Sequence, residues 1–385
     1  MPERWDIFCR VVDNFGDAGV CWRLARQLAL EHRFGVRLWI DHLPTLARLH
    51  PDVVDTPRQT IDEVEVLSWD DAVDLRSGDH PLPQVVVEAF GCGLPEAYVE
   101  AMAHASRPPL WLGLEYLSAE PWVATHHRLP SPHPRLPLER YYFFPGFVEG
   151  TGGLLRESDL FARRDAFGPQ QRAAFWRAAG HEPPEPGALT VAVFAYETAP
   201  LAGLLQAWET GTVDTVAAIP EGKLLAAALA HFGAAEIPAN RLLHRGALEV
   251  RVVPFVPQAR FDELLWSCDV AFVRGEDSFV RAQWAQRPFI WHIYPQEEQA
   301  HWRKLDAFLE LYGEGLAAPA ATALQHLWHA WNQVEGARVS PGSAWAAYAS
   351  HRATLREHAI RWAARLAGIG GLADNLARFC RDKLK

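Results

Sequence analysis

Two acidic residues stand four positions apart at the end of the first strand-like segment. WDIFCRVV (5–12) is followed by DNFGDAG (13–19), in which Gly16 and Gly19 allow a tight turn around Asp13 and Asp17. A carboxylate at the tip of a strand and near a helix N-terminus is placed to act as a general base on an incoming nucleophile. The same residue types also form Asx turns and helix N-caps. The spacing therefore leaves a catalytic and a structural interpretation open.

A second candidate lies directly after the strand-like segment VAFV, where RGEDSFVRAQW begins. The residues of interest there are Arg274, Gly275, Glu276, Asp277 and Ser278. They lead into a helix whose first backbone N–H groups can hold an anion, and the arginine adds a bidentate phosphate donor. The alternative is an ordinary helix cap with a solvated glutamate. Glu276 and Asp277 would repel a phosphate unless one of them contacts sugar hydroxyls. The pattern alone therefore leaves the anion site and the helix cap open.

Aromatic residues and one amide lie where two further strands end. They are Phe194 and Tyr196 in VFAYE, and Phe255, Gln258 and Phe261 in PFVPQARF. Aromatic faces beside an amide could stack on a nucleobase and read its edge. Packing in a core is the more frequent fate of such residues, so this alternative also stays open.

Other patterns indicate little chemistry. GCG (91–93) lacks the third glycine of a dinucleotide-binding loop, and neither a serine-hydrolase elbow nor a P-loop occurs. His292, Glu297, Glu298 and His301 are close in sequence, but only the last two have helical metal-ligand spacing, and the set is expected at the surface. No metal site and no cofactor are therefore expected.

The elements that must position these residues alternate between strands and helices. The first half predicts strands at 5–12, 36–40, 84–90 and 111–117, helices at 20–33 and 95–105, and long loops over 118–150. From LTVAVFAY (189–196) the alternation resumes as far as PFIWHIY, and several helices finish the chain. Strands separated by helices of about ten residues predict parallel sheets covered on both faces. Ligands of such sheets bind beyond the carboxyl ends of the strands.

The clearest change in composition, HEPPEPGA (181–188), predicts an interdomain linker. We therefore expect an N-terminal Rossmann-like domain over 1–183 and a C-terminal one over 184–367, with the last helix, 368–385, packing back on the first domain. The expected fold class is α/β, with two doubly wound domains facing one another across a cleft.

The composition argues against several classes of partner. The 385 residues include 37 basic and 47 acidic side chains, a net charge of −10, whereas a protein that contacts nucleic-acid phosphates is normally basic. No apolar stretch approaches a membrane span, and the N-terminus lacks the apolar core of a signal peptide. Five scattered cysteines without a CxxC pair suit a reducing compartment. A cytoplasmic protein that binds neither nucleic acid nor membrane is expected.

Long segments of the chain resemble one family. VVDNFGDAGVCWRLARQLA (11–29) and the block from PFVPQARF to WRKLDAFL (254–309) are similar to the bacterial elongation factor P arginine rhamnosyltransferases, the EarP family. FGCGLPEAY, LWLGLEYLSAE and FAYE extend the resemblance over nearly the whole chain. It implies a GT-B glycosyltransferase that moves rhamnose, with inversion, from dTDP-β-L-rhamnose to one arginine of elongation factor P. That modification supports rescue of ribosomes stalled at polyproline.

The resemblance also implies roles for the motif residues, position by position. Asp13 would be the catalytic base, with Asp17 required in the same loop and Glu276 assisting. The thymidine would be held by Phe255, Gln258, Phe261 and Tyr196, and the diphosphate and sugar by Arg274, Gly275, Asp277 and Ser278, with Gly16 also counted among the donor-binding positions. Arg274 and the helix N-terminus after it would stabilise the leaving diphosphate without a metal.

Two other functions remain to be separated from this one. One is an inverting GT-B transferase that uses a different nucleotide sugar. The other is a non-catalytic protein that binds a translation factor and has kept a nucleotide pocket. The acids at strand ends argue against the second, because binding alone does not require a base. A nicotinamide-dependent dehydrogenase is disfavoured by the missing glycine fingerprint.

Overall fold

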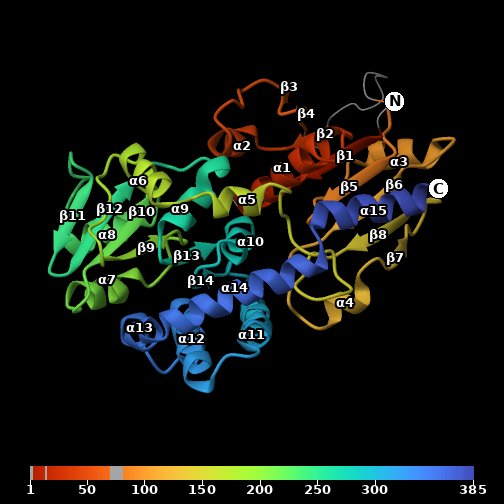
Figure 1. The fold of residues 1–385 in the computed structure, drawn as a ribbon. Helices are drawn as coiled ribbons and strands as arrows, with labels where there is room; N and C mark the ends of the chain where they lie inside the picture. Colours follow the sequence, from red (N-terminus) through yellow and green to blue (C-terminus); the bar gives the residue numbers. More distant parts are fainter. Residues whose placement is uncertain (1–2, 14, 70–80) are drawn as a thin grey trace. The chain divides into compact units, whose positions relative to one another are not determined.

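The computed structural model describes residues 3–13, 15–69 and 81–385. The chain forms two compact units, the first made of Met1–Ser158 with Arg365–Lys385 and the second of Asp159–Ala364 (Figure 1). The chain passes from the second unit back to the first between Ala364 and Arg365. This point lies inside α14 (Arg352–Ile369), a single helix of 18 residues. Within the described residues, no helix combines the length and the apolar character that a membrane crossing requires.

The first unit is built on a largely parallel sheet. Its described residues form eight strands in the order β3-β4-β2-β1-β5-β6-β8-β7, and only β3 and β7, at the edges, pair antiparallel. The strands are β1 (Arg4–Cys9), β2 (Gly35–Ile40), β3 (Arg58–Ile61), β4 (Val64–Ser68), β5 (Val85–Ala89), β6 (Leu110–Leu114), β7 (Pro130–Pro132) and β8 (Glu139–Phe143). The helices assigned to this unit are α1 (Phe15–Leu30), α2 (Leu43–Leu49), α3 (Glu96–His104), α4 (Trp122–His126) and α15 (Leu372–Leu384).

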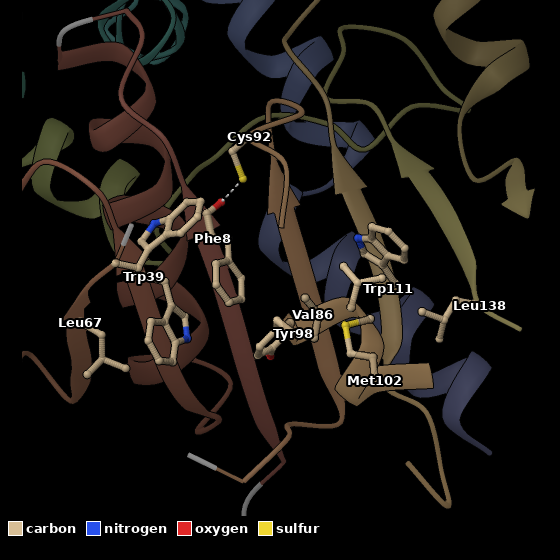
Figure 2. Close-up of a cluster of buried hydrophobic side chains, with 11 residues drawn as sticks. Phe8, Trp39, Leu67, Val86, Cys92, Tyr98, Met102, Trp111 and Leu138 are labelled. Carbon is tan, nitrogen blue, oxygen red and sulfur yellow. Dashed lines mark hydrogen bonds between the residues drawn. The ribbon is translucent and has the colours of Figure 1, made fainter. Parts of the chain in front are cut away.

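One face of this sheet packs against α3 through a cluster of large side chains. Phe8 and Trp39, opposite one another on β1 and β2, stack with ring centroids 5.5 Å apart. Val86 and Trp111 are likewise partners on β5 and β6, and Met102 of α3 is fully buried in the same cluster (Figure 2). The helix α15 packs against α1 and β6. The cluster thus packs on the strands around β1, the strand that leads into the Asp13 loop.

Residues 118–150 contain regular structure, so the prediction of loops alone is wrong. The helix α4 and the strands β7 and β8 lie there, and β8 pairs in parallel with β6, placing Tyr141 opposite Leu112. The segment ERYYF of β8 is rich in aromatic residues, which favour a pleated, half-buried surface. The prolines that suggested a loop, Pro130 and Pro132, lie on the edge strand β7, where a missing N–H is tolerated.

The second unit has a six-stranded sheet among its described residues, in the order β11-β12-β10-β9-β13-β14. Only β11 pairs antiparallel. The strands are β9 (Leu189–Val193), β10 (Thr215–Pro220), β11 (Leu242–Arg245), β12 (Leu248–Val253), β13 (Val270–Arg274) and β14 (Phe289–His292). The helices are α5 (Leu160–Asp165), α6 (Pro169–Ala178), α7 (Leu201–Glu209), α8 (Leu225–Phe232), η1 (Gln258–Arg260), α9 (Phe261–Ser267), α10 (Asp277–Trp284), η2 (Glu297–Gln299), α11 (Ala300–Gly313), α12 (Ala318–Trp331), α13 (Pro341–Ser350) and most of α14.

The boundaries between the compact units lie at 158/159 and 364/365, whereas the sequence predicted boundaries at 183/184 and 367/368. Ser158 still belongs to the first unit, because its backbone N–H donates to Glu31, directly after α1, and Glu157 pairs with Arg23 of α1 at 2.6 Å. Residues 159–183 pack on the second unit, where α6 contacts α9 and the ring of His181 bonds the carbonyl of Val252. The proline-rich segment 181–188 therefore lies within the second unit.

Candidate active site

The backbone after β1 is held by two carboxylates rather than by a neighbouring strand. The N–H of Val11 donates to Asp41 at 2.9 Å, and the N–H groups of Val12 and Asp13 donate to one oxygen of Asp17 at 2.8 and 2.7 Å. The strand consequently ends at Cys9, although the sequence predicted it to continue to residue 12. The Asp17 side chain thus shapes the loop that presents Asp13.

Asp17 is almost fully buried in the first turn of α1. Burial raises the pKa of its carboxyl, while hydrogen bonds from the backbone of Asp13 and Val12 and from the Tyr116 side chain act in the opposite direction. Tyr116 in turn stacks on Phe90, with ring centroids 4.4 Å apart. Neither Asp41 nor these two aromatic residues was a sequence candidate. The signal that could have found them is their position, since each follows the end of a parallel strand.

Asp13 lies against Gly16, which explains why a glycine is found there. The N–H of Gly16 donates to the Asp13 carbonyl at 2.6 Å, and a Cβ on Gly16 would lie 2.6 Å from Oδ2 of Asp13. Any larger residue would therefore displace the carboxylate. The structure places Gly16 as a neighbour of the candidate base, and its expected contact with a donor stays a prediction. Asn14, in the same loop motif, lies outside the described residues.

In the second unit, Arg274 ends β13 with its guanidinium against two aromatic rings. Its central carbon lies 4.8 Å from the ring centroid of Phe194 and 4.6 Å from that of Tyr196. Gly275 follows with φ of 60°, a left-handed conformation that favours glycine. The Ser278 hydroxyl then closes the turn, because it accepts from the Arg274 N–H at 3.2 Å and donates to the Arg274 carbonyl.

The residues expected to read a nucleobase gather around this turn. The Gln258 amide donates to Asp277 Oδ2 at 2.8 Å, and Phe261 meets Phe194 edge to face at 5.4 Å. Phe255 is half-buried beyond the end of β12. Glu276 immediately precedes α10, and its side chain makes no cap hydrogen bond to that helix. These contacts bring together residues of three chain segments, namely Tyr196, Gln258, Phe261, Arg274, Asp277 and Ser278. Their contacts with a donor, and those of Phe255 and Glu276, remain predictions.

His292 is buried at the end of β14, so the expectation that it lies at the surface is wrong. Its Nδ1 accepts from the backbone N–H of Tyr196 at 3.2 Å, which fixes the position of that aromatic residue. Burial, aided by the positive charge of Arg274, lowers the pKa of His292 to about 3. The ring is therefore neutral near pH 7 and adds no second positive charge beside Arg274. Within the described residues, no group of three or more His, Cys, Asp or Glu side chains is arranged to hold a metal.

Solved structures define the class of protein. The calicheamicin glycosyltransferase CalG4 is similar with a TM-score of 0.51 at 15% identity, covering 99% of this chain and 98% of its own. The spinosyn rhamnosyltransferase SpnG is similar with a TM-score of 0.53 at 13% identity, covering 98% and 99%. Likeness at these identities shows the fold alone. The chain therefore has the GT-B fold of glycosyltransferases.

The amino-acid sequence identifies the family within this class. The family model of the elongation factor P (EF-P) rhamnosyltransferase EarP matches residues 5–381. The protein-arginine rhamnosyltransferase of Pseudomonas putida is 47% identical over 391 residues and covers the full length of both chains. That of Pseudomonas aeruginosa is 44% identical and covers 99% of each. A solved structure on EarP-mediated arginine glycosylation of EF-P has 37% identity and a TM-score of 0.69, covering 98% of this chain and 99% of its own. The chain belongs to the EarP family.

We expect His292→Asn to flatten the pH dependence of stability. The unfolded chain protonates this ring below about pH 6.5, whereas the folded chain keeps it neutral down to about pH 3. The contribution of His292 is therefore complete above pH 6.5 and falls by about 1.4 kcal/mol per pH unit below it. Urea titrations at about pH 7 and about pH 5 should show a loss of unfolding free energy that is about 2 kcal/mol smaller in the variant.

The exposed His244 provides the matched control. His244→Asn should leave the pH dependence as it is in the unaltered chain. Other histidines with lowered pKa, such as His127 and His181, contribute equally to every variant and cancel in the comparison. Equal losses in His292→Asn and His244→Asn would contradict a buried, neutral His292.

Proposed function

We propose that this chain transfers rhamnose from a nucleotide-linked donor to an arginine side chain of translation elongation factor P. The observation that carries the proposal is the match to the EarP family over residues 5–381, together with protein-arginine rhamnosyltransferases that match over 99–100% of both chains. The donor we propose is dTDP-β-L-rhamnose, and the transfer inverts the anomeric carbon. The enzyme acts in the cytoplasm, where its acceptor supports translation through polyproline, and it binds neither nucleic acid nor membrane.

Asp13 is the proposed base. An arginine side chain is protonated in water and is a poor nucleophile as guanidinium. A carboxylate beside it attracts the cation, orients one nitrogen toward the anomeric carbon, and accepts a proton as the new bond forms. The N–C bond forms as the bond from the anomeric carbon to the diphosphate oxygen breaks, and dTDP leaves with the electron pair. Two observations support this role, because Asp17 holds the backbone of Asp13 and Gly16 leaves room for the Asp13 carboxylate.

The second-unit residues are the proposed donor site. Tyr196, Phe255, Gln258 and Phe261 hold the thymidine by stacking and by an amide contact. Arg274, Gly275, Asp277 and Ser278 surround the diphosphate and sugar, and Glu276 assists. The charge that develops on the leaving diphosphate is stabilised by the guanidinium of Arg274 and the first N–H groups of α10. We therefore propose a transfer that requires no metal and no cofactor.

Intact mass spectrometry tests the reaction directly. Elongation factor P incubated with this chain and dTDP-β-L-rhamnose should gain the mass of one deoxyhexose, and the gain should persist in EDTA. The control is an acceptor whose target arginine is replaced by lysine, which should gain nothing. A gain on the lysine variant, or none on the native acceptor while dTDP still binds, would refute the proposed acceptor. A gain abolished by EDTA would refute metal-independent transfer.

Asp13→Asn should abolish transfer and leave dTDP affinity within about twofold, because it removes the base and no donor contact. The measurements are single-turnover transfer and calorimetric titration with dTDP. Asp52→Asn, an exposed carboxylate in the same unit, removes the same charge and should change neither quantity. If Asp13→Asn loses dTDP binding together with activity, Asp13 is a structural residue and not the base.

Phe255→Ala should weaken dTDP binding by about 5- to 150-fold, the loss of roughly 1–3 kcal/mol of base stacking. The control is Phe232→Ala, a half-buried aromatic residue at the end of α8 that has no place in the proposed donor site. Calorimetry with dTDP and UDP also identifies the preferred base. A variant with a lower melting temperature but unchanged dTDP affinity would assign Phe255 to core packing.

A further inference from the structure

A cavity of about 360 Å³ lies in the second unit, away from every residue of the proposed donor site. Its walls come from the residues that precede β13 and β14, from the end of α13 and from the first turns of α14. The lining residues are Asp269, Arg287, Ala349, Ser350, Arg352, Ala353 and Arg356. Three arginines among seven residues make this an unusual composition for a chain of net charge −10.

The one carboxylate in the cavity is already engaged. Asp269 Oδ2 accepts from the backbone N–H of Thr190 at 3.0 Å and from its hydroxyl at 2.8 Å, and it lies 4.0 Å from Arg172. By contrast, Arg287, Arg352 and Arg356 form no ion pair with any carboxylate in the described part of the chain. The cavity therefore has a net positive lining.

The positive groups are close enough to oppose one another. Arg352 and Arg356 are four residues apart on α14 and so lie on the same side of the helix, where like charges are unfavourable. Arg287 lies in a partly buried position, and the pKa of its guanidinium is lowered first by burial and next by the charge of Arg356, while the charge of Asp269 acts in the opposite direction. The hydrogen bond from its guanidinium to the carbonyl of Trp266 is long, at 3.5 Å. An anion in the cavity would relieve this repulsion.

The cavity lies at the amino ends of the strands of this sheet, and the proposed donor site lies at their carboxyl ends. Asp269 precedes the first residue of β13, whereas Arg274 is its last residue. Five residues of strand at about 3.3 Å each put the two ends about 16 Å apart. Because β13 and β14 run parallel, Arg287 before β14 lies on the Asp269 side, and His292 at its end lies on the Arg274 side. The arginine cluster is therefore not a part of the donor site.

We propose that this cavity is a second anion site, which binds a small molecule with one or two phosphoryl groups. Guanidinium groups offer paired N–H donors that match phosphate oxygens, and three of them can surround a diphosphate. The volume is at the lower end of the ~300–1,000 Å³ of small-molecule pockets, which suits a phosphate or a diphosphate rather than a protein segment. The proposal does not depend on the transfer reaction, because none of the residues that line the cavity takes part in it.

The test is calorimetric titration of the full chain with inorganic pyrophosphate, repeated with inorganic phosphate and with citrate. Arg356→Gln removes an exposed guanidinium at the cavity, and Arg287→Gln removes a more buried one. Each should raise the Kd for pyrophosphate at least about tenfold, the effect of losing one charged hydrogen bond. Arg338→Gln, an exposed arginine outside the cavity, should change it by less than about twofold.

Arg274→Gln separates the two anion sites. In that variant a pyrophosphate-binding event should remain, and adding Arg356→Gln should raise the Kd of that event at least about tenfold. The second site is refuted if binding disappears with Arg274→Gln alone, or if Arg356→Gln and Arg287→Gln behave like Arg338→Gln. Citrate binding as tight as pyrophosphate binding would refute the phosphoryl class of ligand, and tighter binding of pyrophosphate than of phosphate would indicate a ligand with two phosphoryl groups.

Discussion

The first-unit site depends on one carboxylate that gathers backbone N–H groups. The Asp17 carboxylate accepts hydrogen bonds from the backbone N–H groups of Val12 and Asp13. Without these bonds the two N–H groups would need other acceptors, such as the carbonyl groups of a neighbouring strand. That exchange ends β1 and turns the chain into α1, leaving Asp13 beyond the carboxyl end of the strand. The turn needs a residue without a side chain at position 16, since a Cβ there would collide with the Asp13 carboxylate. The placement of the proposed base in this loop is therefore a consequence of hydrogen bonds to the backbone N–H groups.

In the second unit, a different set of groups holds a side chain at the carboxyl end of a strand. There the turn after β13 is closed by a hydroxyl, as Ser278 bonds both backbone groups of Arg274. The Arg274 guanidinium remains at the strand end over the rings of Phe194 and Tyr196, and buried His292 holds the backbone of Tyr196. A neutral imidazole is suited to this place, because a cation there would repel Arg274. Hydrogen bonds, aromatic contacts and the absence of a second positive charge thus fix the position of the Arg274 side chain.

Much of the architecture follows from local pattern, whereas the roles of single residues do not. Alternating strands and helices predicted parallel sheets, and the strand-end rule led to Asp13, Arg274 and their neighbours. The strand β8 was missed because its flanking prolines are loop signals unless the edge strand β7 is known. Burial of His292 could not be predicted either, since it depends on Trp331 of α12, about forty residues later, packing against the ring at 5.8 Å. Long-range packing of this kind has no local sequence signal.

Asp13 and Asp17 show why residue type and spacing cannot assign a base. Both are acids in one loop, and replacement of either would be expected to lower transfer. The Asp17 carboxylate supports the loop, because it accepts hydrogen bonds from two backbone N–H groups. The same carboxyl is buried, and burial raises its pKa. Loss of Asp17 would release the N–H of Asp13 and move the candidate base. A drop in activity at position 17 is therefore no evidence of contact with substrate. The distinction lies in whether donor binding and loop geometry survive the substitution, and the proposed base is the residue whose loss leaves both intact.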